Sequence, residues 1–527
     1  MSPRGTLLIV PLTDASPAAM RQAMDAAAAA GADAVEARLD YLDNCGADAL
    51  GLLLDHPPRP VIATCRRRAE GGRCDWPDDR RAALLAQAVR LGARWVDFEL
   101  AALDGAGELL AALEQAPAAE LIVSCHDFEK RPDDLPAILD RLEAGPGHIN
   151  KIAFTARGPE DAWAALDILR RSRKPAIVLA MGEAGLASRL LARKFGAFGT
   201  FAALTADAAS APGQPTIAEL RGLYRWDAIS PATAVYGVIA CPVAHSMSPA
   251  VHNAAFAASR LDAVYMPLRV EAGAEPFNRC LDAVLARPWL NVRGLSVTIP
   301  HKENALARVG PDNVDELSRA IGAINTIAIT GEAARPLRGW NTDYAAAMDA
   351  LAGALDSRRE SLHGRRVAVL GAGGAARAIV AALAHYGADT TIYNRTVARA
   401  EQLAREFDRG AAGAVRAEGI EALSLRTGRS GQLNAEIIIN CTPIGMHPHV
   451  VASPLPPGVA LGAGTVVFDT IYNPSRTRLL REAAAAGCRT VSGVDMFVYQ
   501  AAAQFELWVH RPAPRDVMRR AVLRQLG

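Results

Sequence analysis

Residues 365–396 place a glycine turn between an apolar run and an alanine-rich stretch, and this segment constrains the fold more than any other. The apolar run, residues 367–370, is typical of a buried parallel strand. The turn, residues 371–376, leads into a predicted helix that ends at Gly387, and a second strand follows over residues 390–393. Small residues in such a turn let the backbone approach a pyrophosphate, and a helix N-terminus supplies N–H groups and positive potential. This order of elements therefore predicts a dinucleotide-binding lobe and not merely a structural turn.

The residues at the end of the second strand distinguish the two nicotinamide dinucleotides. An NAD site usually has an acidic residue about 20 positions after the turn, where it binds the ribose hydroxyls. This chain has Asn394, Arg395 and Thr396 there instead. An arginine at this place is either an ordinary surface cation or a partner of the extra phosphate of NADP. Because this arginine follows a nucleotide-binding motif, we expect it to bind the extra phosphate, so the predicted cofactor is NADP(H).

The length and composition are those of a multidomain enzyme. A chain of 527 residues, half of them hydrophobic, is too long for one ordinary core. The net charge of +1 predicts no global attraction to nucleic acid or membranes. The eight cysteines form no CxxC pair, which indicates reduced thiols in a cytoplasm, and we expect no metal. No apolar run reaches the roughly 18 residues of a membrane span, and the first strand begins too early for a signal peptide.

The first half alternates short apolar runs with helical stretches such as residues 80–91 and 160–171. The eight runs cover residues 6–12, 34–39, 61–65, 95–100, 121–125, 149–154, 176–181 and 197–204. Eight strand–helix units predict a (β/α)8 barrel, and the alternative is an open, doubly wound sheet. A barrel would place its chemistry at the C-terminal ends of its strands.

Polar side chains follow several of these strands: Glu36 and Arg38, then Arg66, His126 and Lys151. A lysine inside a barrel is costly unless its charge is lost or paired, and desolvation makes it a nucleophile toward ketones. His126, one strand away, would then move a proton. Taken singly, Lys151 is more simply an ion-pair partner of Glu36, and His126 a hydrogen-bonded core histidine. Together, on successive strand ends, they favour Schiff-base chemistry.

Five motifs within residues 5–222 resemble those of type I 3-dehydroquinate dehydratases. They are EARLD at residues 36–40, CRRRAEGG at 65–72, SCHDF at 124–128, NKIA at 150–153 and SAPGQ at 210–214. The resemblance implies that Lys151 forms an imine with the substrate ketone and that His126 is the general acid and base. The substrate-binding residues that it implies are Glu36, Arg38, Arg66, Glu70, Met181, Arg189, Ser210 and Gln214. Arg189 is the expected partner of the substrate carboxylate.

Two pairs of polar residues stand out in the second half. Ser246 and Ser248 precede a predicted helix, where hydroxyls either cap the helix or hold an anionic substrate. Lys302 follows a predicted strand, and Asp343 lies in the sequence GWNTD. Alone, each is a common surface or capping residue. A Lys–Asp pair that faces a nicotinamide would serve as a proton relay for alcohol oxidation.

Residues 235–527 resemble shikimate dehydrogenases. The motifs are GLSVTIPHKEN at residues 294–304, NCTPIGM at 440–446 and GVDMFVYQAA at 493–502. The resemblance implies that Lys302 and Asp343 are the catalytic pair. The substrate-binding residues that it implies are Ser246, Ser248, Thr298, Asn325, Tyr472 and Gln500. The NADP-binding residues that it implies are Gly371, Ala372, Gly373, Gly374, Ala375, Asn394, Arg395, Thr396, Thr442 and Gly493.

Three positions depart from the commonest dehydrogenase pattern. Ala240 and Tyr344 stand where glycine is usual or frequent, and Ser296 stands where asparagine is usual. Ser296 lies near the substrate turn, so the preference between shikimate and quinate stays open. The catalytic pair is unaffected.

We therefore expect an α/β chain of two enzymes. The barrel spans residues 1–222, a linker 223–234, a substrate lobe 235–344, a Rossmann nucleotide lobe 345–490 and returning helices 491–527. The barrel would dehydrate 3-dehydroquinate to 3-dehydroshikimate, and the second half would reduce that product to shikimate with NADPH. The alternatives are a second half that acts mainly on quinate, with NAD, and a metabolite sensor that has lost catalysis. The presence of both catalytic pairs argues against a sensor.

Overall fold

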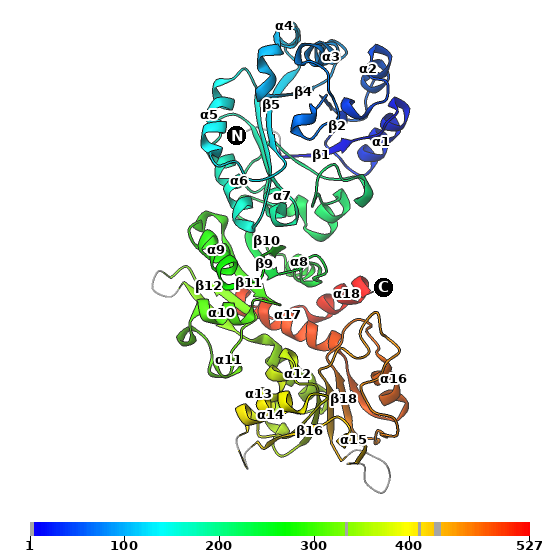
Figure 1. The fold of residues 1–527 in the computed structure, drawn as a ribbon, viewed down its shortest axis with the longest axis vertical. Coiled ribbons are helices and arrows are strands. Elements are labelled where there is room, and N and C mark those ends of the chain that lie inside the picture. Colours follow the sequence, from blue (N-terminus) through cyan, green and yellow to red (C-terminus); the bar gives the residue numbers. More distant parts are fainter. Residues whose placement is uncertain (1–4, 333–335, 409, 411–412, 426–433, 527) are drawn as a thin grey trace. The chain divides into compact units, whose positions relative to one another are not determined.

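The computed structural model describes residues 5–332, 336–408, 410, 413–425 and 434–526 (Figure 1). The chain forms two compact units, residues 1–246 with 262–292 and residues 247–261 with 293–527. Both units combine helices and strands. In the part of the chain that the structure describes, no helix is both long and apolar enough to cross a membrane.

The eight strands predicted for the first half are present and form one parallel sheet. They are β1 (Leu7–Leu12), β2 (Ala34–Arg38), β3 (Val61–Thr64), β4 (Trp95–Glu99), β5 (Glu120–Asp127), β6 (Ile149–Thr155), β7 (Ala176–Met181) and β8 (Gly199–Phe201). The sheet order is β7-β6-β5-β4-β3-β2-β1-β8. The Phe198 N–H donates to the Ala176 carbonyl over 2.8 Å, which brings the start of β8 beside β7 and nearly closes the barrel. The alternative of an open sheet is wrong.

Helices surround this barrel (Figure 1). They are α1 (Pro17–Ala29), α2 (Ala47–Leu54), α3 (Asp78–Arg90), α4 (Gly107–Gln115), α5 (Leu135–Ala144), α6 (Pro159–Arg171) and α7 (Leu186–Leu190). The eighth strand–helix unit differs from the prediction, because β8 has 3 residues and a π turn, η6 (Glu219–Leu223), follows it. The strand ends early because the Ala203 N–H donates to the Pro215 carbonyl and not to a barrel strand.

Apolar side chains fill the N-terminal end of the barrel, one from each strand. They are Ile9, Ala34, Ile62, Trp95, Ile122, Ile149, Ile177 and Phe201. Because side chains alternate along a strand, the next inward residues lie two positions later. On β2, β4, β5 and β6 these are Glu36, Asp97, Ser124 and Lys151, all of them buried. A dry apolar floor therefore supports a layer of buried polar groups.

The predicted linker, residues 223–234, packs against other residues of the first unit. Trp226 is 1% exposed and begins the short turn η7 (Trp226–Ala228). Lys194 Nζ, from the loop after α7, donates to the carbonyls of Pro231 and Thr233 over 2.9 and 2.7 Å. The first unit then continues through β9 (Ala234–Ala240), β10 (Ala263–Arg269) and α9 (Ala274–Leu285). Strands β9 and β10 pair in parallel.

The second unit contains an antiparallel ribbon and a bundle of helices. The strands β11 (Val292–Val297), β12 (Thr326–Ile329) and β13 (Leu337–Trp340) pair in that order. The helices are α8 (Ser248–Ala258), α10 (Lys302–Val309), α11 (Glu316–Ile321), α12 (Thr342–Ala354), α17 (Gly493–Val509) and α18 (Arg515–Leu526). Helix α17 packs against both α12 and α18.

A six-stranded parallel sheet forms the predicted nucleotide lobe. Its strands are β14 (Arg366–Leu370), β15 (Asp389–Asn394), β16 (Val415–Gly419), β17 (Ile437–Asn440), β18 (Val466–Asp469) and β19 (Arg489–Val491). Its helices are α13 (Gly374–His385), α14 (Val397–Phe407), α15 (Ala422–Leu425) and α16 (Arg478–Ala485). The order β16-β15-β14-β17-β18-β19 is that of doubly wound dinucleotide folds, which bind their ligand where the order reverses. Here the order reverses between β14 and β17, and the predicted strand, turn, helix and strand are confirmed.

Candidate active sites

A cavity at the C-terminal ends of the barrel strands gathers every site residue predicted for the first half. Its lining includes Glu36, Arg38, Arg66, Glu70, His126, Lys151, Met181, Arg189, Ser210 and Gln214. Phe128, Leu179 and Phe201 add apolar walls. The polar groups therefore meet in one mostly desolvated space, where electrostatic interactions are stronger than in water.

Lys151, on β6, is held between two carboxylates. Its Nζ lies 2.7 Å from Asp97 Oδ2 and 3.3 Å from Glu36 Oε1, and the lysine side chain is 6% exposed. The anticipated ion pair with Glu36 is thus present, but the nearer partner is Asp97, which the motifs did not single out. A signal existed: residues 95–100, WVDFEL, put two acidic residues in a strand buried on both faces, where an apolar run is usual.

Asp97 is shared between Lys151 and Arg66. Arg66 Nη2 lies 2.8 Å from Asp97 Oδ2, and Ser124 Oγ donates to Asp97 Oδ1 over 2.6 Å. Burial alone would raise the pKa of Asp97, but the charges of Arg66 and Lys151 hold that pKa well below its usual range. Asp97 is therefore ionised and fixes the positions of two cations.

His126 and Glu70 form a second pair in the same cavity. His126 Nδ1 lies 3.0 Å from Glu70 Oε2, and the His126 backbone N–H donates to the same oxygen over 2.9 Å. Burial, with the nearby charges of Arg66 and Lys151, lowers the pKa of His126 well below its usual value, so the imidazole is neutral. Burial also raises the pKa of Glu70 to about 7, against the opposing effect of Arg66. A neutral imidazole beside such a carboxyl group is suited to accept a proton.

Arg189 is a buried cation that has no carboxylate partner among the described residues. Its Nη1 donates to the Phe201 carbonyl over 3.5 Å, and its buried Nε has no hydrogen-bond partner in the described part of the chain. Burial lowers the pKa of Arg189 to about 10. A guanidinium in this state would gain from a bidentate anion such as a carboxylate.

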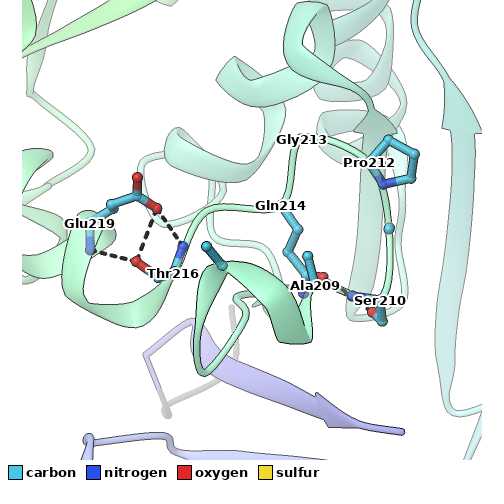
Figure 2. A pocket seen from close by; sticks show the side chains of 9 residues that line it. Ala209, Ser210, Pro212, Gly213, Gln214, Thr216 and Glu219 are labelled. Carbon is cyan, nitrogen blue, oxygen red and sulfur yellow. Dashed lines mark hydrogen bonds between the residues drawn. The ribbon is translucent and has the colours of Figure 1, made fainter. Parts of the chain in front are cut away.

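The loop after β8 carries Ser210 and Gln214, and the hollow that it lines is shown in Figure 2. Gln214 Oε1 accepts from the backbone N–H and the hydroxyl of Ser210 over 2.9 and 3.2 Å. The buried Gln214 Nε2 has no partner in the described residues, so it is available to a ligand. Arg38, in contrast to Gln214, already has a partner in the protein, because its guanidinium donates two hydrogen bonds of 2.9 and 2.8 Å to Asp40.

In the second unit, Lys302 and Asp343 lie at the starts of two helices and touch. Lys302 Nζ is 2.6 Å from Asp343 Oδ2, and the two side chains are 31% and 20% exposed. Asn325 Nδ2 donates to Asp343 Oδ1 over 2.9 Å and lies 3.4 Å from Gln500 Oε1. Four predicted residues are thus connected, and the charged pair stays open to an incoming ligand.

Gln504 completes this cluster and was not predicted. Its Oε1 accepts from Ser296 Oγ over 2.9 Å. Its Nε2 donates to Thr326 Oγ1 over 3.2 Å and to the Asn325 carbonyl over 3.3 Å. The signal was its position on α17, one turn after Gln500, which places both amides on the same helix face.

The remaining predicted substrate residues lie in loops and at a helix start. Ser248 begins α8 and is 8% exposed, and Ser246 lies two residues earlier. Thr298 directly follows β11 and is half-buried. Tyr472, in the loop after β18, is 42% exposed.

The glycine turn passes against the end of β17 and leaves room in front of α13. Gly371 has a φ of +105°, and a Cβ there would lie 3.0 Å from Thr442 Cγ2. A Cβ on Gly373 or Gly374 would meet nothing within 4 Å, and no side chain caps the N-terminus of α13. Ala372 and Ala375 flank these glycines. The space and the uncapped N–H groups fit a pyrophosphate.

Two further groups of predicted cofactor residues lie after β15 and at the start of α17. Asn394 Nδ2 donates to the Thr396 carbonyl over 2.9 Å, and Arg395 between them is exposed. At the start of α17, a Cβ on Gly493 would lie 2.4 Å from the Ile471 carbonyl, so only glycine fits. That contact sets how closely α17 approaches the end of β18.

Family models match both halves of the chain. Residues 8–231 match the type I 3-dehydroquinase model. Residues 238–327 match the shikimate dehydrogenase substrate binding domain, residues 354–442 match shikimate / quinate 5-dehydrogenase, and residues 493–523 match the shikimate 5'-dehydrogenase C-terminal domain.

Curated relatives agree with these models. The chain is 37% identical over 502 residues to a chloroplastic bifunctional 3-dehydroquinate dehydratase/shikimate dehydrogenase of Arabidopsis thaliana, covering 92% of this chain and 79% of that protein. It is 42% identical over 298 residues to a shikimate dehydrogenase (NADP(+)) of Methanosarcina acetivorans, covering 55% of this chain and 98% of that one. A solved dehydroquinate dehydratase and shikimate dehydrogenase from S. pombe is 24% identical, covers 99% of both chains and has a TM-score of 0.45.

We predict that Glu70 titrates near neutral pH. Because the cavity disfavours the charged form, the carboxyl carbon of Glu70 should titrate near pH 7, where the structure places its pKa, and not near pH 4.3 as an exposed glutamate does. Carbon-13 NMR of glutamate-labelled protein measures this, with Glu70→Gln to assign the signal. Titration near pH 4 would mean that the charge of Arg66 outweighs burial.

Proposed function

Because the chain belongs to the family of bifunctional 3-dehydroquinate dehydratase/shikimate dehydrogenases, we propose that it dehydrates 3-dehydroquinate to 3-dehydroshikimate and then reduces this product to shikimate. The observation that carries the proposal is the pairing of the buried Lys151 with Asp97 and Glu36, in the cavity that also holds Arg189. We assign the first reaction to residues 1–222 and the second to residues 235–527, joined by residues 223–234. The family matches of both halves support this division.

In the dehydratase, the Lys151 ammonium would transfer one proton to the substrate ketone oxygen, and the resulting free amine would attack the carbonyl carbon. The carbonyl oxygen leaves as water, and the protonated imine retains a positive charge beside Asp97 and Glu36. This charge draws electrons from the neighbouring C–H bond, so neutral His126 removes that proton. The proton on His126 then leaves with the β-hydroxyl group as a second water, and water finally hydrolyses the imine. Glu70 orients His126 throughout through Nδ1.

The substrate carboxylate would bind Arg189, whose guanidinium lacks an anionic partner among the described residues. Gln214 Nε2 and Ser210 would bind substrate oxygens from the loop after β8. Arg66, Arg38 and Met181 complete the lining. A charge-assisted hydrogen bond is worth about 1.5–3 kcal/mol, so we expect Arg189 to contribute about that much for each bond to the substrate carboxylate.

In the dehydrogenase, Lys302 would donate a proton to the ketone oxygen of the substrate as that oxygen gains charge. Asp343 holds the ammonium and returns it to the protonated state through exchange with water. Asn325 and Gln500 would orient the substrate, together with Ser246, Ser248, Thr298 and Tyr472. When bound, NADPH supplies the hydride. The turn from Gly371 to Ala375, with Thr442, Gly493 and Asn394–Thr396, would hold this cofactor.

A preference for quinate is the second candidate for the dehydrogenase. It is favoured by Ser296, which replaces the usual asparagine and binds Gln504, and by the family model, whose description includes quinate. Turnover of quinate and shikimate by the same preparation decides between the two. We propose the cytoplasm as the compartment, although the Arabidopsis thaliana relative is chloroplastic.

We predict that Lys151→Ala abolishes dehydration and leaves shikimate oxidation intact. Alanine cannot form an imine, whereas the second unit contains its own catalytic groups. Borohydride added with 3-dehydroquinate should trap an adduct on the unmodified enzyme, and mass spectrometry locates it. An unmodified Lys151 peptide, in a preparation that dehydrates its substrate, would rule out the imine mechanism.

Replacing either member of the Lys302–Asp343 pair should lower the dehydrogenase kcat by about 10²–10⁴-fold, the usual contribution of a positioned acid or base. NADPH binding should change little, because the pair moves protons and does not hold the cofactor. Steady-state kinetics of Lys302→Ala and Asp343→Asn, with NADPH titrations by fluorescence, test this. A variant with normal kcat and only a raised KM for NADPH would contradict the assignment.

The exposed Arg395 should read the 2′-phosphate of NADP(H). One charge-assisted bond contributes about 1.5–3 kcal/mol, so Arg395→Ala should weaken NADP(H) by roughly ten- to a hundredfold and scarcely affect NAD(H). Values of kcat/KM for both cofactors, in both proteins, measure the difference. Equal losses for the two cofactors would show that Arg395 supports the fold or stacks on adenine.

A further inference from the structure

A further buried ion pair lies beside the residues of the dehydratase cavity. Arg81, on the outer helix α3, points its guanidinium toward Glu99 at the end of β4, and Arg81 Nη1 lies 2.7 Å from Glu99 Oε2. Both side chains are 0% exposed. Neither residue is among those that line the cavity, and the proposed mechanism assigns no chemical step to either.

Arg81 is fixed on three sides. Its Nη1 also donates to the Cys65 carbonyl over 2.7 Å, and its Nη2 donates to Asp78 Oδ1 over 2.8 Å. Cys65 directly precedes Arg66, so Arg81 holds the backbone from which the Arg66 side chain enters the cavity.

Glu99 transmits this contact to the same segment. Its Oε1 accepts the backbone N–H of Arg67 over 3.0 Å and lies 3.3 Å from Arg66 Nη1. Arg66 Nη2 in turn binds Asp97, which binds Lys151. The contacts therefore form one continuous series: Arg81, Glu99, Arg66, Asp97, Lys151.

The buried charges of this series balance when Glu36 is included. The three carboxylates Glu36, Asp97 and Glu99 face the three cations Lys151, Arg66 and Arg81, and the partly exposed Asp78 adds a further carboxylate beside Arg81. Removing one partner of a buried pair leaves an uncompensated charge, which is strongly unfavourable. Without Arg81, Glu99 would draw Arg66 toward itself and away from Asp97. Lys151 would then lose the fixed carboxylate that orients its Nζ.

We propose that Arg81 is a positioning residue of the dehydratase: by neutralising Glu99 it keeps Arg66 on Asp97, and so holds Lys151 where it attacks the substrate ketone. This inference rests on the proposed dehydration. Arg81 acts only through Glu99, Arg66 and Asp97 and touches no reacting atom.

Arg81→Met tests the proposal in the full-length protein. A displacement of about 1 Å at a reacting group costs up to about 10²-fold in rate, so the dehydratase kcat should fall by about ten- to a hundredfold. The single-turnover rate at which borohydride traps the Lys151 imine should fall with it. Shikimate oxidation in the same chain should not change. Arg90→Met, on the same helix at an exposed pair with Glu108, is the matched control and should keep full dehydration.

The double variant Arg81→Met, Glu99→Gln separates positioning from simple destabilisation. It removes both charges of the pair, so the array is balanced again, and it should recover trapping rate relative to Arg81→Met alone. If Arg81 only stabilised the barrel, the single variant would trap a smaller fraction of molecules at the normal rate, and thermal denaturation would show the loss.

Three outcomes would overturn the inference: a kcat for Arg81→Met within twofold of the parent, a normal trapping rate with reduced amplitude, or a double variant no faster than the single one. If the parent enzyme itself neither dehydrates 3-dehydroquinate nor forms a trapped adduct, the proposed function fails instead. The two failures are therefore distinguishable.

Discussion

The buried ammonium of Lys151 is the interaction on which the first half depends. A lysine charge in an apolar barrel costs several kcal/mol unless it is compensated, and here Asp97 and Glu36 compensate it at 2.7 and 3.3 Å. Asp97 is in turn kept ionised by the charges of Arg66 and Lys151, which lower its pKa against the effect of burial. The layer of apolar side chains at the N-terminal end of the barrel, which includes Ile9 and Phe201, excludes water from this side of the charges. The charges therefore interact strongly with one another. The apolar layer and the two carboxylates therefore act together to stabilise the charge of Lys151.

The candidate catalytic pair of the second unit, Lys302 and Asp343, is not fully buried, so its charges need less compensation by the protein. Lys302 and Asp343 are positioned by the starts of α10 and α12, and the amides of Asn325, Gln500 and Gln504 connect these helices to α17. In the cofactor turn Gly371 passes close to Cys441 and Thr442, and at the start of α17 Gly493 passes close to the Ile471 carbonyl. Precise geometry here comes from hydrogen-bonded helix ends and glycine contacts.

Much of this organisation was predictable, because short apolar strands and the glycine turn leave strong local signals. The eight barrel strands, the nucleotide lobe and the placement of His126 and Lys151 at neighbouring strand ends follow from such signals, whereas Arg189 was predicted only from the family resemblance. Asp97 and Gln504 were missed because their importance depends on which distant residue they meet, on β6 and on β12. The short β8 and the packed linker depend on tertiary hydrogen bonds, of Ala203 and Lys194, that no local pattern reveals. A charged residue within an otherwise apolar strand, such as Asp97 on β4, is a useful sequence signal for a buried ion pair.

The two proposed reactions fit each other chemically, since the product of the barrel is the ketone that the second half would reduce. The most direct test adds 3-dehydroquinate and NADPH to the purified protein and follows the absorbance of NADPH. The account predicts that NADPH disappears without any added enzyme, and that Lys151→Ala stops this loss until 3-dehydroshikimate is supplied. The account would be contradicted if the unmodified protein oxidised NADPH with 3-dehydroshikimate but not with 3-dehydroquinate, or with neither.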